Sequence, residues 1–364
     1  MSSTTNTSLG ADAWVIDDDI ERLREWGTDR TYQLPNSADA QVTLGASEAC
    51  SLQLTDPSGQ LSRQHARMSR EPMWTAGSGN PRWVVVDLDS KNGTWLNGSR
   101  RPKFVLEPGG ELGVGGITLI AESPRLVALR GFLARLLGWS ADRSDTVDLA
   151  VRSVRMSATH HAALALCADS DGELLPIARG LHRFALGGER PFVVCDPKRR
   201  EAEGESYISG VAALRAAASG TMCIWAKRLP RDFRELMAEL RGPSTRVQLI
   251  ACGQRPSDRT DLASAPIEIP PLSARTAELD RIIDEYAEDA AALLRVTTPF
   301  SKADRAWVRT QSAESFAEVD KGTARIVALR EAGNVMRAAG MLGMAHASLN
   351  EWIRRRRLPP GILR

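Results

Sequence analysis

The sequence has few cysteines, no long apolar run and no excess of charge of one sign, and each shortage excludes a class of protein. Its five cysteines are scattered singly, without any Cys-x-x-Cys spacing. An odd number of isolated cysteines argues against a disulfide framework and a zinc site, so we expect reduced thiols and no metal. No apolar run could cross a bilayer, and the N-terminus lacks the segments of a secretory signal. These absences predict a cytoplasmic protein that does not associate with a membrane.

The charges are nearly balanced, with 47 Lys and Arg against 45 Asp and Glu, so the net charge of +2 indicates no class of partner. An apolar content of 43% and a charged content of 25% are those of a globular protein. A length of 364 residues exceeds one ordinary core and predicts two or three domains.

Short strands and turns alternate between residues 31 and 122. The run 83–88 predicts a buried strand, Asn92-Gly93 supplies the positive-φ pair of a tight turn, and 94–96 resumes a strand, with Trp95 expected in the core. This pattern predicts an all-β sandwich. Residues 1–30 are expected to form a tail and a short helix within 17–26, where acidic residues occupy the first turn.

Two motifs in this region resemble those of the forkhead-associated (FHA) domain. The chain reads Ser-Arg-Gln-His at 62–65 and Ser-Lys-Asn-Gly-Thr at 90–94. The family carries Ser-Arg-x-His on one loop and Ser-x-Asn-Gly-Thr on the next. The resemblance spans most of residues 31–122 and implies a domain that binds phosphothreonine in a protein partner.

The resemblance also implies which residues form the phosphopeptide site. Ser62 would contact the phosphate, and Asn92 would hold the peptide backbone. Lys91 would approach the phosphate, and Asn97 would add a backbone contact. His65 is expected to brace the loops rather than to catalyse a reaction.

The sequence departs from the family at the arginine that normally holds the phosphate. The family's Gly-Arg pair corresponds to Gly45-Ala46 here. An arginine–phosphate contact contributes about 1.5–3 kcal/mol, so its loss weakens binding unless Arg63, Arg67 or Lys91 replaces it. The alternative is docking to a partner without phosphate.

After a linker helix predicted at 127–139, within a linker of residues 123–145, strand-like and helical runs alternate from 146 to 297. Such alternation predicts an α/β domain with a parallel sheet. The order of these segments resembles the AAA+ domain of the enhancer-binding activators that act on sigma-54 polymerase. The segments that carry this resemblance are Glu173–His182, Ser219–Met222, Val247–Ala251 and Ile267–Leu272.

The residues that a nucleotide site needs are missing from this α/β region. The segment Cys167–Glu173 stands where the phosphate loop belongs, and it has one glycine, no lysine and two aspartates that would repel a triphosphate. Trp225 and Ala226 stand where that family has an Asp-Glu pair after its Walker B strand, and Gln254 occupies the polar sensor position. We therefore expect no enzymatic activity, no catalytic residues and no cofactor.

The C-terminal region, residues 298–364, is predicted to be helical. Two short helices, one ending near Gly343 and one starting near Ala347, form a helix-turn-helix pattern. The sequence of these two helices resembles the Fis-type helix-turn-helix at the C-terminus of enhancer-binding activators. Exposed polar and basic side chains that would contact DNA are Ser348, Asn350, Arg354, Arg355, Arg356 and Arg357.

The sequence as a whole predicts a DNA-binding transcription regulator with an FHA input domain and a nucleotide-inactive AAA+-like core. Such regulators usually bind paired half-sites, which predicts a homodimer. Two alternatives stay open, a signalling scaffold that does not bind DNA and an ATP-driven sigma-54 activator.

Overall fold

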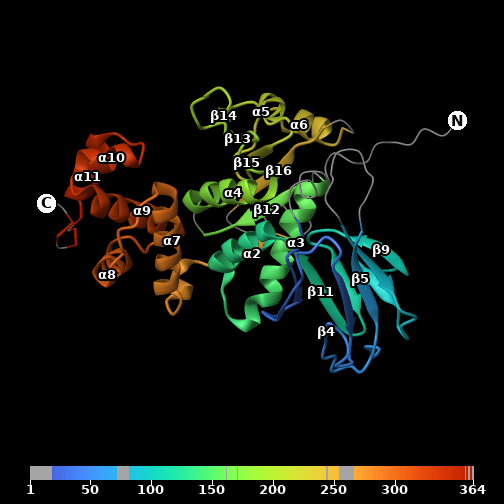
Figure 1. The fold of residues 1–364 in the computed structure, drawn as a ribbon. Helices are drawn as coiled ribbons and strands as arrows, with labels where there is room; N and C mark the ends of the chain where they lie inside the picture. The colour runs from blue at the N-terminus through green and yellow to red at the C-terminus, as the bar shows by residue number, and fades with distance from the viewer. Residues whose placement is uncertain are drawn as a thin grey trace. The chain divides into compact units, whose positions relative to one another are not determined.

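The computed structural model describes residues 19–71, 82–160, 162–169, 171–242, 245–253, 266–356, 358–359 and 361–362. The chain divides into two compact units. The first consists of residues 1–166 and 178–267 and contains a β-sandwich and most of a parallel sheet (Figure 1). The second consists of residues 167–177 and 268–364 and is mainly helical (Figure 1).

The β-sandwich has two sheets, with strand orders β2-β1-β11-β10-β7-β8 and β4-β3-β5-β6-β9. Apart from the parallel pair β3–β4, the strand pairs that we describe are antiparallel. The predicted sandwich is therefore confirmed. Its strands are β1 (Arg22–Glu25), β2 (Thr31–Gln33), β3 (Gln41–Gly45), β4 (Leu52–Gln53), β5 (Ala66–Glu71), β6 (Arg82–Asp87), β7 (Thr94–Leu96), β8 (Ser99–Arg100), β9 (Lys103–Leu106), β10 (Glu111–Val114) and β11 (Ile117–Glu122).

The core of the sandwich is built from alternate residues of these strands. Val42 and Leu44 of β3 are buried, whereas Gln41, the first residue of the strand, is exposed. Met68 of β5 and Leu112 of β10 are fully buried in the same core. Because successive side chains of a strand point to opposite faces, this alternation places one face of each sheet inside.

The short helix expected within residues 17–26 is wrong, because this segment contains strand β1. Backbone pairing joins β1 to β2 on one side and to β11 on the other. Arg22 and Arg24 form ion pairs with Glu122 of β11 at 2.8 and 2.6 Å. The acidic residues of this segment suggested the start of a helix. The strand forms instead because it pairs with β11, where Arg24 also finds the carboxylate of Glu122, 98 positions further along the chain. The loop that we expected at Met73–Pro81 lies outside the described residues.

Two helices follow the sandwich, α2 (Pro124–Leu137) and α3 (Ser144–His160), with a 3-10 turn η1 (Ala141–Arg143) between them. Helix α2 confirms the linker helix predicted at 127–139, and it begins where the Ser123 hydroxyl accepts a hydrogen bond from the Leu126 amide. Helix α3 was not expected from the sequence.

Ion pairs join α3 to the sandwich, and the pair between Arg24 and Asp148 is buried. Asp148 is fully buried and accepts hydrogen bonds from Arg24 Nη2 at 2.6 Å, Arg24 Nη1 at 3.0 Å and the Gly27 amide at 2.9 Å. Arg152 forms two hydrogen bonds of 2.6 Å with the carboxylate of Glu111 in β10. Charged contacts therefore fasten this helix to the sheet that contains β1, β10 and β11.

The parallel sheet has the strand order β14-β13-β15-β16-β12-β17. Strand β13 is parallel to β14 and β15, and β15 is parallel to β16, which confirms the predicted α/β region with a parallel sheet. The strands are β12 (Leu164–Cys167), β13 (Phe192–Cys195), β14 (Ser206–Tyr207), β15 (Thr221–Trp225), β16 (Gln248–Gly253) and β17 (Ile267–Glu268). The helices of this region are α4 (Asp171–Leu186), α5 (Gly210–Ala216) and α6 (Phe233–Leu240).

Helices dominate the second unit, where α7 and α9 pack together around Ala287, Ala290 and Val327. The prediction of a helical C-terminal region is confirmed, although α8 was not expected. The elements are η3 (Leu272–Arg275), α7 (Leu279–Leu294), α8 (Lys302–Gln311), α9 (Phe316–Ala332), α10 (Val335–Met341) and α11 (His346–Arg354). Across the described residues, no helix has the length and apolar content that spanning a membrane requires.

Candidate functional site

Two loops of the β-sandwich lie against each other, the loop 60–65 before β5 and the turn 90–93 between β6 and β7. The Lys91 amide donates to Ser62 Oγ at 3.1 Å. Asn92 Nδ2 donates to the Gln60 carbonyl at 2.7 Å. Three residues predicted from the sequence, Ser62, Lys91 and Asn92, are therefore brought together.

His65 joins the same two loops from beneath and is fully buried. The Ser62 amide lies 3.2 Å from Nδ1, and the Gly93 carbonyl lies 3.2 Å from Nε2. An amide can only donate and a carbonyl can only accept, so Nδ1 is the acceptor and Nε2 carries the hydrogen. This geometry supports the bracing role that we expected for His65.

Asp87 fixes the shape of the turn that contains Asn92. Its Oδ1 accepts hydrogen bonds of 2.6 Å from both Ser90 Oγ and Thr94 Oγ1. Partial burial acts to raise the pKa of Asp87, but these hydroxyl donors hold that pKa below its ordinary value. Asp87 therefore stays ionised and keeps the turn in one conformation, a role that the sequence did not reveal.

The predicted site residues differ in how far their side chains are exposed. The side chains of Arg63 and Lys91 are exposed, whereas those of Ser62 and Asn92 are half-buried. Asn97 lies in the next turn, where its Oδ1 accepts a hydrogen bond from the Glu111 amide at 3.0 Å. That contact makes Asn97 a brace of the β7–β8 turn, separate from the hydrogen bonds that join the first two loops.

Trp95 was expected in the core, but 39% of its surface is exposed. Its Nε1 donates to the Asn92 carbonyl at 3.3 Å. The indole therefore lies on the solvent side of the turn, because Trp95 points to the opposite face of β7 from the buried Thr94.

The third loop, after β3, approaches the Ser62 loop closely. The Ala46 amide donates to the Ser62 carbonyl at 3.1 Å, and a Cβ atom on Gly45 would lie only 2.2 Å from the Arg63 carbonyl oxygen. Glycine at 45 thus allows the two backbones to touch. Ala46 itself is exposed beside this contact, where the family pattern has an arginine.

Protonation of His65 is expected to oppose folding of this site. Burial lowers the pKa of His65 below its ordinary value of about 6.5, more than the Gly93 carbonyl and Asp87 raise it. The unfolded chain therefore takes up the proton first, so the free energy of unfolding falls as the pH drops below about 6.5. In a pH titration followed by NMR of labelled imidazoles, the resonance absent from His65→Asn should show the Nε2–H tautomer and a midpoint below 6.5. An Nδ1–H tautomer, or a midpoint above 6.5, would contradict the geometry.

Two short helices, α10 and α11, lie near the C-terminus where the sequence predicted a pair of helices. Gly343, with φ +61°, lies between α10 and α11, and Ala338, Ala339 and Leu349 of these helices are buried. Ser348 and Asn350 are exposed on α11.

The arginines at the end of α11 differ from one another in their contacts. Arg354 and Arg355 are exposed and form ion pairs with Glu351, at 2.8 Å for Arg355. Arg356 lies over the Trp352 ring, with 5.0 Å from its guanidinium carbon to the ring centroid, and pairs with Glu318 at 3.6 Å. Arg357 lies outside the described residues.

The segment that stands in place of a phosphate loop contains a buried acid. Glu173 is 6% exposed and accepts a hydrogen bond from the Phe316 amide, at the start of α9, at 2.8 Å. Burial raises the pKa of this carboxyl group. Trp225 and Ala226, which replace the acidic pair, are buried, and Gln254 lies outside the described residues.

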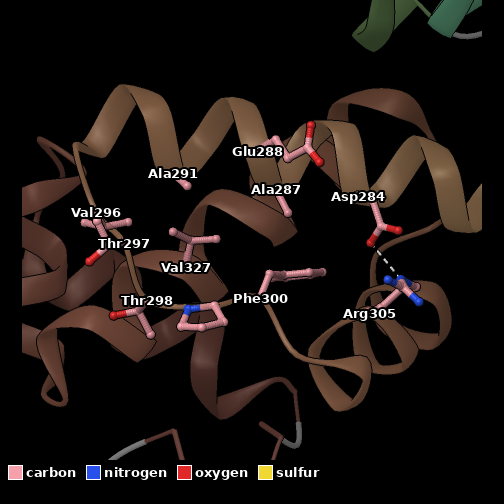
Figure 2. A pocket seen from close by; sticks show the side chains of 11 residues that line it. Asp284, Ala287, Glu288, Ala291, Val296, Thr297, Thr298, Phe300, Arg305 and Val327 are labelled. Carbon is pink, nitrogen blue, oxygen red and sulfur yellow. Dashed lines mark hydrogen bonds and ion pairs between the residues drawn. The ribbon is translucent and has the colours of Figure 1, made fainter.

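A separate hollow of about 380 Å³ lies in the second unit between α7, residues 296–300 and α9 (Figure 2). Phe300 and Val327 contribute to its apolar lining, and an ion pair of 2.7 Å between Asp284 and Arg305 lies at one end. None of the binding residues predicted from the sequence lines this hollow.

Comparison with known proteins identifies the sandwich. Residues 42–115 match the family model of the FHA domain, so this part of the chain is an FHA domain, as its motifs predicted. No curated protein matches the chain.

Similar solved structures cover about a quarter of the chain. One comes from a structural and functional analysis of phosphothreonine-dependent FHA domain interactions, with 24% identity over 28% of this chain and 93% of that chain, and a TM-score of 0.22. The MEK1 FHA domain in complex with a HOP1 phosphothreonine peptide has 23% identity over 28% of this chain and 95% of that chain, with a TM-score of 0.23. The Mycobacterium tuberculosis Rv1747 FHA-1 domain has 26% identity over 28% of this chain and 93% of that chain, with a TM-score of 0.22.

Proposed function

We propose that this protein is a DNA-binding regulator whose FHA domain binds a phosphothreonine-containing partner. One observation carries the FHA part of this proposal: Ser62 and Asn92 lie on two loops that are joined directly, through the 3.1 Å hydrogen bond from the Lys91 amide to Ser62 Oγ, and indirectly through His65. Loops that are already held in place lose little conformational entropy when a peptide binds.

The chemistry of these residues suits a phosphate on threonine. Ser62 Oγ accepts the Lys91 N–H, which leaves the Ser62 hydroxyl hydrogen free to donate to a phosphate oxygen. The exposed ammonium of Lys91 and guanidinium of Arg63 supply positive charge near a group that carries about −1.5 to −2 charges. Asn92 uses Nδ2 for the Gln60 carbonyl, so its Oδ1 remains to accept a peptide N–H.

Replacing Ser62 or Asn92 with alanine is expected to weaken phosphopeptide binding by about tenfold, because each removes a hydrogen bond to a charged or backbone group. Affinities of the full-length protein for a phosphothreonine peptide library would be compared among wild type, Ser62→Ala and Asn92→Ala. Ser58→Ala is a matched control, since Ser58 is exposed and bonds to Asp56 outside the joined loops. Unchanged partner binding in both variants would mean that the domain docks its partner without this site.

We propose that DNA binds through α11, because this helix combines exposed polar and basic side chains. Ser348 and Asn350 would contact base edges. Arg354 and Arg355 would neutralise DNA phosphates once their ion pairs with Glu351 are broken. Arg356 is less suited to this role, because it stacks on Trp352 and pairs with Glu318.

Replacing Arg354 and Arg355 with alanine together is expected to weaken DNA binding and to make it less dependent on salt. Each lost phosphate contact lowers the slope of log K against log salt by about 0.9, so the double variant should lose about 1.8. DNA fragments from upstream of the protein's own gene would be titrated at several salt concentrations. Arg309→Ala, an exposed arginine of α8 that pairs with Asp280, is the control. Absence of salt-dependent binding by the wild type would favour the scaffold alternative.

We also propose that the α/β region neither binds nor hydrolyses ATP and that the protein is a homodimer. The absence of a lysine and the presence of Asp169 and buried Glu173 in the replaced phosphate loop support the first statement. Magnesium-dependent ATP turnover, or a monomer in sedimentation experiments, would contradict the respective statement.

A further inference from the structure

Arg100 lies against the turn that carries Asn92, although it belongs to a different strand. It pairs with Trp95 across the β7–β8 hairpin. A Cβ atom built on Gly93 would lie 2.1 Å from Arg100 Nε and 2.9 Å from Arg100 Nη2. The guanidinium therefore occupies the place of a side chain at Gly93, which is a glycine both for this reason and for its φ of +74°.

The charge of Arg100 is available for a ligand. Its side chain is exposed, as are those of Arg63 and Lys91 on the neighbouring loops. In the ranges that the structure describes, none of these three cations has a carboxylate within ion-pair distance, whereas Arg22, Arg24 and Arg152 of the same sandwich and its adjoining helix are paired with acids. Cations held unpaired around a binding turn favour an anionic partner.

Arg100 contacts a different residue of the turn from those assigned to the phosphate. The phosphate side of the turn is defined by Ser62 and Lys91, which are hydrogen-bonded at 3.1 Å. Arg100 lies instead against Gly93, which follows Asn92 in the chain, whereas Lys91 precedes it, and Asn92 is the residue that holds the peptide backbone in the proposed function. A peptide that crosses Asn92 would present a residue next to the phosphothreonine, rather than the phosphate itself, to this guanidinium.

We propose that Arg100 is a specificity-determining residue, which pairs with an acidic side chain adjacent to the phosphothreonine of the partner. This proposal rests on the proposed phosphopeptide function of the FHA domain. It assigns the partner a chemical class, an acidic phosphothreonine segment, and it gives the sandwich a cation outside the position where Ala46 replaces the family's arginine.

The test is an acidic scan of phosphothreonine peptides with the full-length protein. One peptide has alanine at every flanking position, and the others carry a single aspartate or a single lysine at each position in turn. We expect wild type to prefer at least one aspartate peptide over the alanine peptide by about fivefold, which is the upper range for an exposed ion pair. Arg100→Gln should abolish this preference, and Arg100→Glu should transfer it to the lysine peptide of the same position.

Arg101→Gln is the matched control, because Arg101 is the adjacent exposed arginine and only its backbone amide contacts the turn region, at the Thr94 carbonyl. This variant should keep the aspartate preference. If Arg100→Gln weakens binding of the alanine peptide and of the aspartate peptides equally, Arg100 contacts the phosphate and the proposal is overturned. If wild type has no aspartate preference, the proposal also fails while the phosphopeptide function stands. Binding of no phosphopeptide at all would overturn both.

Discussion

Replacing Asp148 with alanine is expected to lower the free energy of unfolding of the first unit by about 3–5 kcal/mol. Asp148 is fully buried and pairs with Arg24, of which only 2% of the side chain is exposed. Without the carboxylate, Arg24 would keep only Glu122 as an acidic partner, at 2.6 Å, and the Gly27 amide would lose its acceptor. A buried cation that loses one of its two acidic partners and an amide that loses its acceptor both lower stability.

The effect of this replacement can be measured by urea unfolding followed by tryptophan fluorescence. Asp29→Ala is the matched control, because Asp29 pairs at 3.1 Å with Arg130, which also contacts Asp148, but 77% of its side chain is exposed. We expect the control to change stability by less than about 0.5 kcal/mol. Equal effects of the two replacements would mean that burial of Asp148 does not contribute to stability.

Replacing Asp304 with alanine is expected to destabilise the second unit by about 3–5 kcal/mol, mainly because it breaks a buried ion pair, and it also removes one half of a capping box. Asp304 is fully buried and completes a capping box with Ser301 at the start of α8. It also accepts hydrogen bonds from Arg330 of α9 at 2.8 Å and 3.1 Å. Because Arg330 Nη1 donates to the Gly361 carbonyl at 3.1 Å, the C-terminal residues should loosen as well.

Hydrogen exchange would locate this effect, since faster exchange is expected in α8, the C-terminal half of α9 and the residues around 361. Asp280→Ala is the matched control: Asp280 pairs with Arg309 at 2.8 Å, but 52% of its side chain is exposed. If Asp304→Ala leaves exchange in α9 unchanged, the ion pair with Arg330 does not hold the two helices together.

Much of the FHA site could be predicted from the sequence because its signals are local. Asn92-Gly93 requires a tight turn wherever it occurs between two strands, and the structure brings Ser62, Lys91 and Asn92 together as the motifs implied. Asn97 has a structural contact that the motifs did not reveal, because its Oδ1 accepts a hydrogen bond from the Glu111 amide. Such a contact depends on strand pairing, which a single stretch of sequence does not reveal.

Errors and omissions in the predicted fold have one physical origin. Residues 17–26 contain acids that would suit the start of a helix, yet Arg24 binds Glu122 and Asp148, which lie 98 and 124 positions further along the chain. Helix α3 was missed for the related reason that its residue Asp148 is buried against the sandwich, where it pairs with Arg24. Residue patterns that treat charged residues as exposed fail where two charges are buried together.

By itself, the sequence determined the β-sandwich with its two joined loops, the alternation of strands and helices after it, and the two short helices near the C-terminus. Hydrophobic periodicity, turn residues and helix caps act over a few positions, so they can be recognised in the chain alone. Only the tertiary structure decided that β1 completes the sandwich, that Asp148 holds α3 to it, and that Arg100 fills the space at Gly93. Each of these depends on groups that become neighbours only when separate strands and helices have packed, because that packing removes water from the buried charges and requires that other protein groups pair with them.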